Sequence, residues 1–141
     1  MGPEAKFYKE IKKSIPEISW IRLENLSSLG TPDLLGYNTS GHFFTVELKV
    51  TKGNKVKFSP HQIAFHVSHP KNTFIMVQAL GPRTSKHVHM FHGSRIMELA
   101  ACGLKLDACS LLLEARIRAH ARYFRRSLFA NGLIQFITYR S

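Results

Sequence analysis

The stretch from residue 30 to residue 49 constrains the fold most, because its pattern predicts two strands joined by a turn, that is, a hairpin, in a short span. A Gly-Thr-Pro segment leads into a short apolar run at residues 33–37, and the turn-forming residues 38–41 follow. Residues 42–50 then alternate between apolar and polar side chains. One face carries Phe44, Val46, Leu48 and Val50, and the other carries Thr45, Glu47 and Lys49. We therefore predict an antiparallel hairpin with one buried face.

Counting across this hairpin brings two carboxylates together. Asp33 falls opposite about residue 46 and is a near neighbour of Glu47. Glu47 and Lys49 share a face because strand side chains repeat every two residues. Pro32 fixes the backbone before Asp33. The pattern predicts two acids and a lysine on one surface.

These residue types suit a metal-assisted reaction on a phosphate. A hard cation such as Mg²⁺ takes oxygen ligands and needs only one or two carboxylates from the protein. It polarises a phosphate and lowers the pKa of an attacking water, while Lys49 stabilises developing charge or positions that water. A Glu-Leu-Lys strand alone is more often an ordinary exposed face. The proline-aspartate pair at hairpin spacing, in a strongly basic chain, instead favours phosphodiester hydrolysis.

The charge balance of the chain indicates a polyanionic partner. Among 141 residues, 20 are Lys or Arg and 9 are Asp or Glu, which gives a net charge of +11. Nucleic acid and an anionic membrane surface are the usual partners of such a chain. We see neither a bilayer-length apolar run nor a leader pattern, so we expect a cytoplasmic protein with no membrane insertion. Cys102 and Cys109 do not make a disulfide framework.

The remaining patterns predict an α/β fold with a mixed central sheet flanked by helices. We expect one domain over residues 1–141, with a core at 1–93 and a C-terminal helical extension at 94–141 that contacts DNA or a second copy. Helices are predicted at residues 4–14, 59–69, 94–102 and from Asp107 to about 129. Further strands are predicted at residues 18–23, 73–80, 87–91 and 133–139.

Several of these motifs together resemble the PD-(D/E)XK nuclease superfamily. The resemblance lies in Gly30-Thr31-Pro32-Asp33 followed by Glu47-Leu48-Lys49, and it covers roughly residues 4–80. Residues 46–52 are similar to the corresponding strand of archaeal Holliday junction resolvases. Arg22-Leu23-Glu24-Asn25 and Ser59-Pro60-His61-Gln62 are closer to VRR-NUC-like nucleases and to the small resolvase-like nucleases of bacteriophages.

The resemblance implies a restriction-endonuclease-like core and assigns roles to individual residues. Asp33 and Glu47 would bind Mg²⁺, for which Mn²⁺ would substitute, with the Leu48 carbonyl as a backbone ligand. Lys49 would be the catalytic lysine, and Gln62 would face the active site. A glutamate on the first helix completes such sites. Glu4 fits it best, with Glu10 and Glu24 as rivals.

Basic residues around this motif are candidates for DNA binding. The loop lysines Lys52, Lys55 and Lys57 directly follow the catalytic strand, and His61 and Arg22 lie near it in sequence. Arg118, Arg122 and Arg125 form a stripe on the long helix, although such stripes are more often solvated. Two histidine groups could suggest zinc, namely His87, His89 and His92, and His61, His66 and His69. We favour histidines on a nucleic-acid face instead.

Together, the sequence patterns and the resemblance predict a Mg²⁺-dependent, structure-selective endodeoxyribonuclease that cuts branched DNA. The resemblance favours a Holliday junction resolvase of phage type, acting as a homodimer because two opposed strands must be cut. A flap, nicking or repair nuclease with the same site is an alternative. A basic DNA-binding protein with a degenerate nuclease fold is another.

Overall fold

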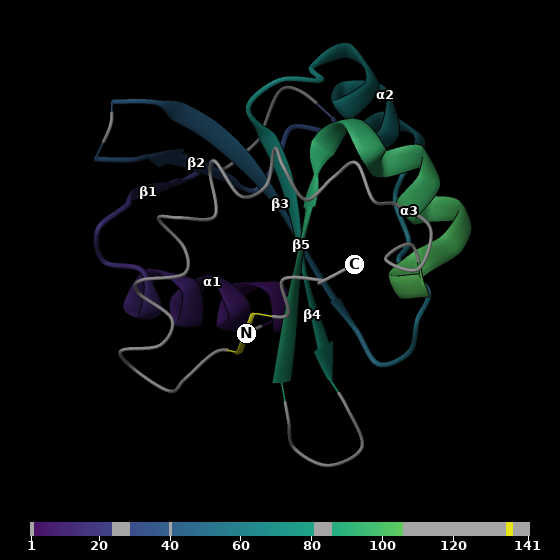
Figure 1. The fold of residues 1–141 in the computed structure, drawn as a ribbon, viewed down its shortest axis with the longest axis horizontal. Helices are drawn as coiled ribbons and strands as arrows, with labels where there is room; N and C mark the ends of the chain where they lie inside the picture. The colour runs from purple at the N-terminus through teal and green to yellow at the C-terminus, as the bar shows by residue number, and fades with distance from the viewer. Residues whose placement is uncertain (1, 24–28, 40, 81–85, 106–134, 137–141) are drawn as a thin grey trace.

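The computed structural model of the chain describes residues 2–23, 29–39, 41–80, 86–105 and 135–136 (Figure 1). The described strands form a six-stranded sheet in the order β1-β2-β3-β4-β5-β6. Its strands are β1 (Ser19–Arg22), β2 (Leu34–Tyr37), β3 (Phe43–Thr51), β4 (Thr73–Leu80), β5 (Lys86–His92) and β6 (Gln135–Phe136). The helices are α1 (Pro3–Ser14), α2 (Pro60–Ser68) and α3 (Ile96–Cys102), and a 3-10 turn, η1 (Gly93–Arg95), precedes α3.

The sheet is mixed. Strands β1, β2 and β3 pair antiparallel, and β3 and β4 pair parallel across the α2 crossover. Strands β4 and β5 pair antiparallel, and β5 and β6 pair parallel. The predicted α/β architecture with a mixed sheet and flanking helices is confirmed. The predicted helix from Asp107 and most of the predicted strand at 133–139 lie outside the described residues.

Helix α1 covers one face of the sheet (Figure 1). Its apolar stripe is fully buried at Phe7 and Ile11, and Ile15 follows at the helix end. These side chains pack against a cluster from the alternating strands that includes Phe44, Val46, Leu48, Phe74, Met76 and Val88. The helix stops before Pro16, as expected from the bias of a residue before proline away from helical backbone.

Helices α2 and α3 lie on the opposite face of the sheet (Figure 1). The second core cluster there contains Ile75, Val77 and Phe91 from the sheet and Ile96, Leu99 and Leu104 from the α3 region. Strand β4 therefore sends side chains into both clusters, which explains its nearly continuous apolar sequence. The first part of the predicted C-terminal extension thus contributes to the core.

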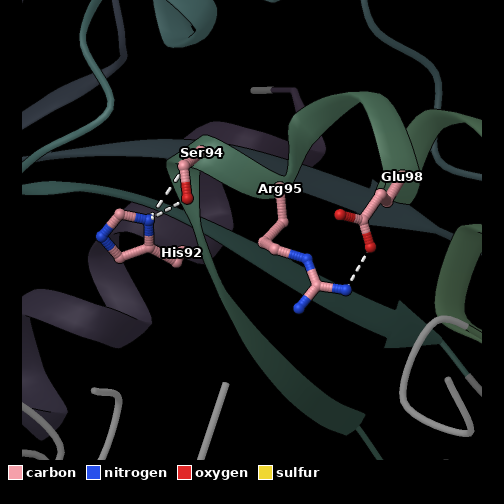
Figure 2. Close-up of polar contacts among 4 residues, drawn as sticks. All are labelled: His92, Ser94, Arg95 and Glu98. Atoms are coloured by element: carbon pink, nitrogen blue, oxygen red, sulfur yellow. Dashed lines mark hydrogen bonds and ion pairs between the residues drawn. The ribbon is translucent and has the colours of Figure 1, made fainter. Parts of the chain in front are cut away.

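The passage from β5 into α3 is fixed by two local polar contacts (Figure 2). The Ser94 backbone N–H donates to His92 Nδ1 at 3.2 Å, and the Ser94 hydroxyl lies 2.6 Å from the same nitrogen. The next residue, Arg95, forms an ion pair with Glu98, which lies one turn further along the chain. Within the part of the chain that the structure describes, no helix has the length and apolar character needed to cross a membrane.

Gly36 offers a test of how tightly β2 and β3 pack on the α1 side. A Cβ at Gly36 would lie 2.4 Å from Cζ of Phe44, whose ring also meets Trp20 and Phe74 edge-on. We expect Gly36→Ala to lower the free energy of unfolding by about 1–3 kcal/mol, because the Phe44 ring must move within a packed core. Urea unfolding measures this change. Gly53→Ala is the matched control, since nothing lies within 4 Å of its Cβ position, and equal stability of the two variants would contradict the packing.

Candidate active site

Strands β2 and β3 bring Asp33 and Glu47 together on the sheet face opposite to α1. Leu34 pairs with Val46, so Asp33, one residue earlier, lies beside Glu47. The predicted register, with Asp33 opposite about residue 46, was therefore one residue off, and the true register places the two acids closer. Glu47 and Lys49 share their face because Val46 and Leu48 point into the α1 cluster.

Backbone groups hold the Asp33 carboxylate in place. The Leu48 N–H donates to Asp33 Oδ2 at 2.8 Å. The Asp33 carbonyl accepts from the Leu23 N–H at 2.8 Å, which ties the residue before β2 to the residue after β1. Pro32 is buried. Asp33 is therefore fixed by β1 on one side and by β3 on the other.

Gln62, in the first turn of α2, connects the two other polar side chains of the site. Its Nε2 donates to Glu47 Oε1 at 2.7 Å, and its Oε1 accepts from Lys49 Nζ at 3.0 Å. The same Oε1 accepts from the Ser59 N–H at 3.0 Å, while the Ser59 hydroxyl accepts from the Gln62 N–H at 3.2 Å. This reciprocal capping box starts the helix and fixes the orientation of the amide.

Gly30 couples the loop before Asp33 to the start of α2. Its φ of +84° lies in the left-handed region that favours glycine. A Cβ at this position would lie 2.3 Å from the His61 carbonyl oxygen and 2.9 Å from the Gln62 nitrogen. Only a residue without a side chain allows this approach, so the glycine positions both Asp33 and Gln62.

Burial dominates the electrostatics of the two carboxyls. It raises the pKa of Glu47 to about 8, with the Asp33 charge adding to the rise and the Lys49 charge opposing it. Burial also raises the pKa of Asp33, against the lowering effects of the Leu48 N–H and of Lys49. An ionised pair is therefore unfavourable unless a further cation lies between the acids.

The donor set fits a divalent cation. Glu47 is 2% exposed, and its Oε2 is a buried oxygen that no donor reaches among the described residues. Asp33, close beside it, gives a second hard oxygen ligand. Two carboxylates are what Mg²⁺ usually takes from a protein, with waters and substrate filling the other positions. A cation there would satisfy Oε2 and offset the repulsion between the acids.

Lys49 is held between Gln62 and an aromatic ring. Its Nζ lies 5.2 Å from the centroid of the Phe58 ring, in addition to its hydrogen bond to Gln62. The side chain is half-buried. A positive charge is thus fixed beside Glu47, where it can act on a bound anion.

Of the acids predicted for the first helix, Glu4 lies nearest the site. Its charge raises the pKa of both Asp33 and Glu47. Glu10 instead accepts a hydrogen bond from Gln78 Nε2 at 2.8 Å, away from the two acids. Glu24 lies outside the described residues. The Leu48 carbonyl as a metal ligand stays a prediction.

The predicted DNA-binding residues separate into three groups. Lys52, Lys55 and Lys57 are exposed in the loop after β3, and His61 is exposed at the start of α2. Arg22 lies on the α1 side of the sheet, with Cζ 5.9 Å from the Tyr8 ring centroid, so it does not join the carboxylates. Arg118, Arg122 and Arg125 lie outside the described residues.

Two of the described histidines are buried in the protein and not exposed to a nucleic acid. His66 is fully buried, and its Nδ1 donates to the Gln62 carbonyl at 2.8 Å, which supports the helix turn that carries Gln62. Burial lowers the pKa of His66. His89 is also buried, so neither ring lies on an exposed face. In the described part of the chain, no three His, Cys, Asp or Glu residues gather in a group that could hold a metal ion.

Sequence reasoning missed two contributors to the site. The reciprocal role of Ser59 was readable from the Ser-Pro-His-Gln spacing, which matches a capping box. The contact of Phe58 with Lys49 had no local signal, because it depends on how the loop after β3 folds back.

Comparisons with known proteins find a likeness to solved structures but none to a family model or a curated sequence. No protein-family model matches the sequence, and no curated protein matches it either. Among solved structures, the chain is similar to Hjc of Archaeoglobus fulgidus, described as a Holliday junction resolvase from an archaeal hyperthermophile. The two share 15% identity with a TM-score of 0.48, over 66% of this chain and 75% of that one.

The pKa of Glu47 predicts a pH-dependent stability in the absence of metal. The unfolded chain ionises Glu47 near its ordinary value of 4.5, whereas the folded chain keeps the proton up to about pH 8. Stability from this group is thus complete below pH 4.5 and is lost as pH rises through about 8. We expect Glu47→Gln to be more stable than the wild type in EDTA at pH 9, with little difference near pH 4.5.

Thermal unfolding in EDTA at several pH values measures this difference. Each kcal/mol corresponds to about 3–5 °C in a chain of this size. Glu17→Gln, at an exposed acid, is the control and should show a constant offset from the wild type. A Glu47→Gln offset that does not grow with pH would contradict the raised pKa.

Proposed function

We propose that the chain is a divalent-metal-dependent nuclease of the PD-(D/E)XK type that hydrolyses phosphodiester bonds in DNA. The observation that carries the proposal is the convergence at Gln62. One amide bonds both Lys49 and Glu47, and Asp33 lies beside Glu47. An acid pair that includes the buried Glu47, with a fixed lysine in the middle of the same strand, is a costly arrangement unless it serves a function.

Asp33 and Glu47 hold the cation, which we take to be Mg²⁺, with Mn²⁺ as a substitute. When bound, the cation supplies Lewis acidity toward the phosphate and lowers the pKa of a ligated water. Glu47 would hold the cation as a carboxylate, so its raised pKa would oppose cation binding at low pH. The Asp33 oxygen bonded to the Leu48 N–H is already oriented.

Lys49 and Gln62 act on the substrate side of the acids. Lys49 stabilises the negative charge that develops on the phosphate in the transition state. Gln62 accepts from the Lys49 ammonium and so fixes where that charge lies, while its amide keeps Glu47 from turning away. Glu4 adds negative charge at the edge of the site.

The loop after β3 binds the DNA backbone through Lys52, Lys55 and Lys57. The Thr51 hydroxyl bonds the Lys55 carbonyl at 2.9 Å, and the Asn54 carbonyl accepts from the Leu104 N–H at 2.8 Å, so the loop is ordered from both sides. Exposed lysines on such a loop give salt-dependent, sequence-independent affinity. His61 adds a contact at the start of α2.

For the substrate we propose branched DNA, and more specifically a four-way junction cut by a homodimer of phage-resolvase type in the cytoplasm of the cell. The support is the combination of motifs described above and the net charge of +11. The same site would also serve a flap, nicking or repair nuclease.

The catalytic proposal predicts the loss of cleavage without the loss of binding. We expect Asp33→Asn and Glu47→Gln each to reduce Mg²⁺-dependent cleavage by at least about a hundredfold, because each removes a charged ligand. DNA affinity in EDTA should stay within about threefold of the wild type, since the loop lysines are unchanged. Gel assays of cleavage and fluorescence anisotropy of binding measure the two effects.

Variants on α1 supply a matched pair for this experiment. Glu4→Gln should slow cleavage, whereas Glu10→Gln, which can keep its bond to Gln78, should not. Full activity of Asp33→Asn or Glu47→Gln would remove the proposed site. An equal effect of the two α1 variants would remove the role of Glu4.

A cleavage assay on a panel of DNA structures tests the proposed substrate. We expect purified protein with Mg²⁺ to introduce paired symmetric nicks into a four-way junction and to leave linear duplex largely intact, because two sites related by a twofold axis match two opposed strands. Flap and single-stranded DNA of the same sequence complete the panel. A preference for linear duplex, or sedimentation as a monomer at assay concentration, would contradict the resolvase proposal.

A further inference from the structure

Three large apolar side chains are exposed on the part of the sheet that the described helices leave open. Ile21, Tyr37 and Phe43 are 52%, 41% and 57% exposed. They lie on β1, on β2 and at the start of β3, where the sheet extends away from α2 and α3 in Figure 1. We call these three residues the apolar patch.

The two aromatic members form a fixed pair. Tyr37 and Phe43 are direct partners in the β2–β3 ladder, and their ring centroids lie 4.5 Å apart. The turn between them is closed by hydrogen bonds between Asn38 and His42, through both backbone and side chain. The rings therefore stand on a rigid hairpin rather than on a free loop.

The apolar patch shares its sheet face with the candidate active site. Phe43 and Glu47 are four residues apart on β3 and point to the same side. At about 3.3 Å per residue the separation is about 13 Å, which corresponds to about four stacked nucleotides of one DNA strand. A strand cut at Glu47 and running along β3 thus reaches Phe43 within a few nucleotides.

Charge near the apolar patch favours a nucleic acid. Residues 18–23 and 34–46 contain no Asp or Glu, so no acid of these segments would repel a phosphate at the apolar patch, while Arg22 lies on the opposite, α1 side of the sheet. A second copy of the chain fits less well. Each of the three half-exposed side chains offers on the order of 100 Å², so the patch offers roughly 300 Å², against about 800 Å² per partner in a stable dimer.

We propose that Tyr37 and Phe43 form a stacking surface for unpaired DNA bases next to the cleavage site. The inference rests on the proposed nuclease function, and it adds how the chain distinguishes open or branched DNA from paired duplex. An aromatic face stacks on any base without reading its identity. In a fully paired duplex the bases are already stacked on one another, so the aromatic surface adds no binding energy.

The test compares single-stranded DNA that carries 2-aminopurine with a fully paired duplex of the same sequence, titrated with the full chain in EDTA. We expect Phe43→Ala and Tyr37→Ala to weaken single-strand binding by roughly 5- to 100-fold and to abolish the fluorescence change on binding. Duplex affinity should change less than twofold. Phe43→Trp should restore single-strand binding, and Met97→Ala, at an exposed apolar residue of α3, should have no effect.

Salt titrations separate stacking from charge. Phe43→Ala should keep the wild-type slope of affinity against salt, whereas Lys55→Ala should reduce it. Unchanged binding in both aromatic variants, or an equal loss for single strand and duplex, would overturn the inference. So would a shift in sedimentation of Phe43→Ala, which would identify a contact between copies. If the wild type does not cleave DNA but Phe43→Ala and Tyr37→Ala still weaken single-strand binding, only the nuclease proposal is overturned.

Discussion

Burying Glu47 beside Asp33 is the constraint on which the arrangement of the site depends. Removing a carboxylate from water is costly, and a second carboxylate at its side increases the cost. The surrounding residues offset it only in part, through the Leu48 N–H on Asp33 and the Gln62 amide on Glu47. One Glu47 oxygen stays without a donor among the described residues. A pair left in this state is expected where a ligand completes it, and is unexpected in a merely structural strand.

Neighbouring residues with fixed conformations hold these side chains in a defined geometry. Gln62 cannot rotate freely, because its carbonyl oxygen accepts from Lys49 and from the Ser59 N–H, so its nitrogen must face Glu47. The capping box that orders α2 therefore also orients the site. Gly30 allows the loop before Asp33 to pack closely against the same helix turn. A single helix start thus fixes one acid, the lysine and the loop that carries the other acid.

Local patterns predicted the strands, the start of α2 at Ser59 and Pro60, and the convergence of Asp33 with Glu47. They could do so because alternation and capping are encoded within a few residues. The exact register was missed by one residue, because the turn closes between Asn38 and His42 and is therefore one residue longer than the predicted turn at 38–41. Local sequence could not decide either whether Glu4 or Glu10 is the acid of the first helix that faces the site. Those residues lie six apart on α1, on different faces, and only the packing of Phe7 and Ile11 decides which one turns to the site.

Strand β3 links three different surfaces along one line. Its start carries Phe43 in the apolar patch, its middle carries Glu47 and Lys49, and its end leads into the lysine loop. Nine residues of strand span about 30 Å, which is about nine nucleotides of one DNA strand. If bases stack at one end and phosphates bind at the other, the preferred substrate has unpaired bases on one side of the cut and continuous backbone on the other. Those requirements meet at a branch point and not within a regular duplex.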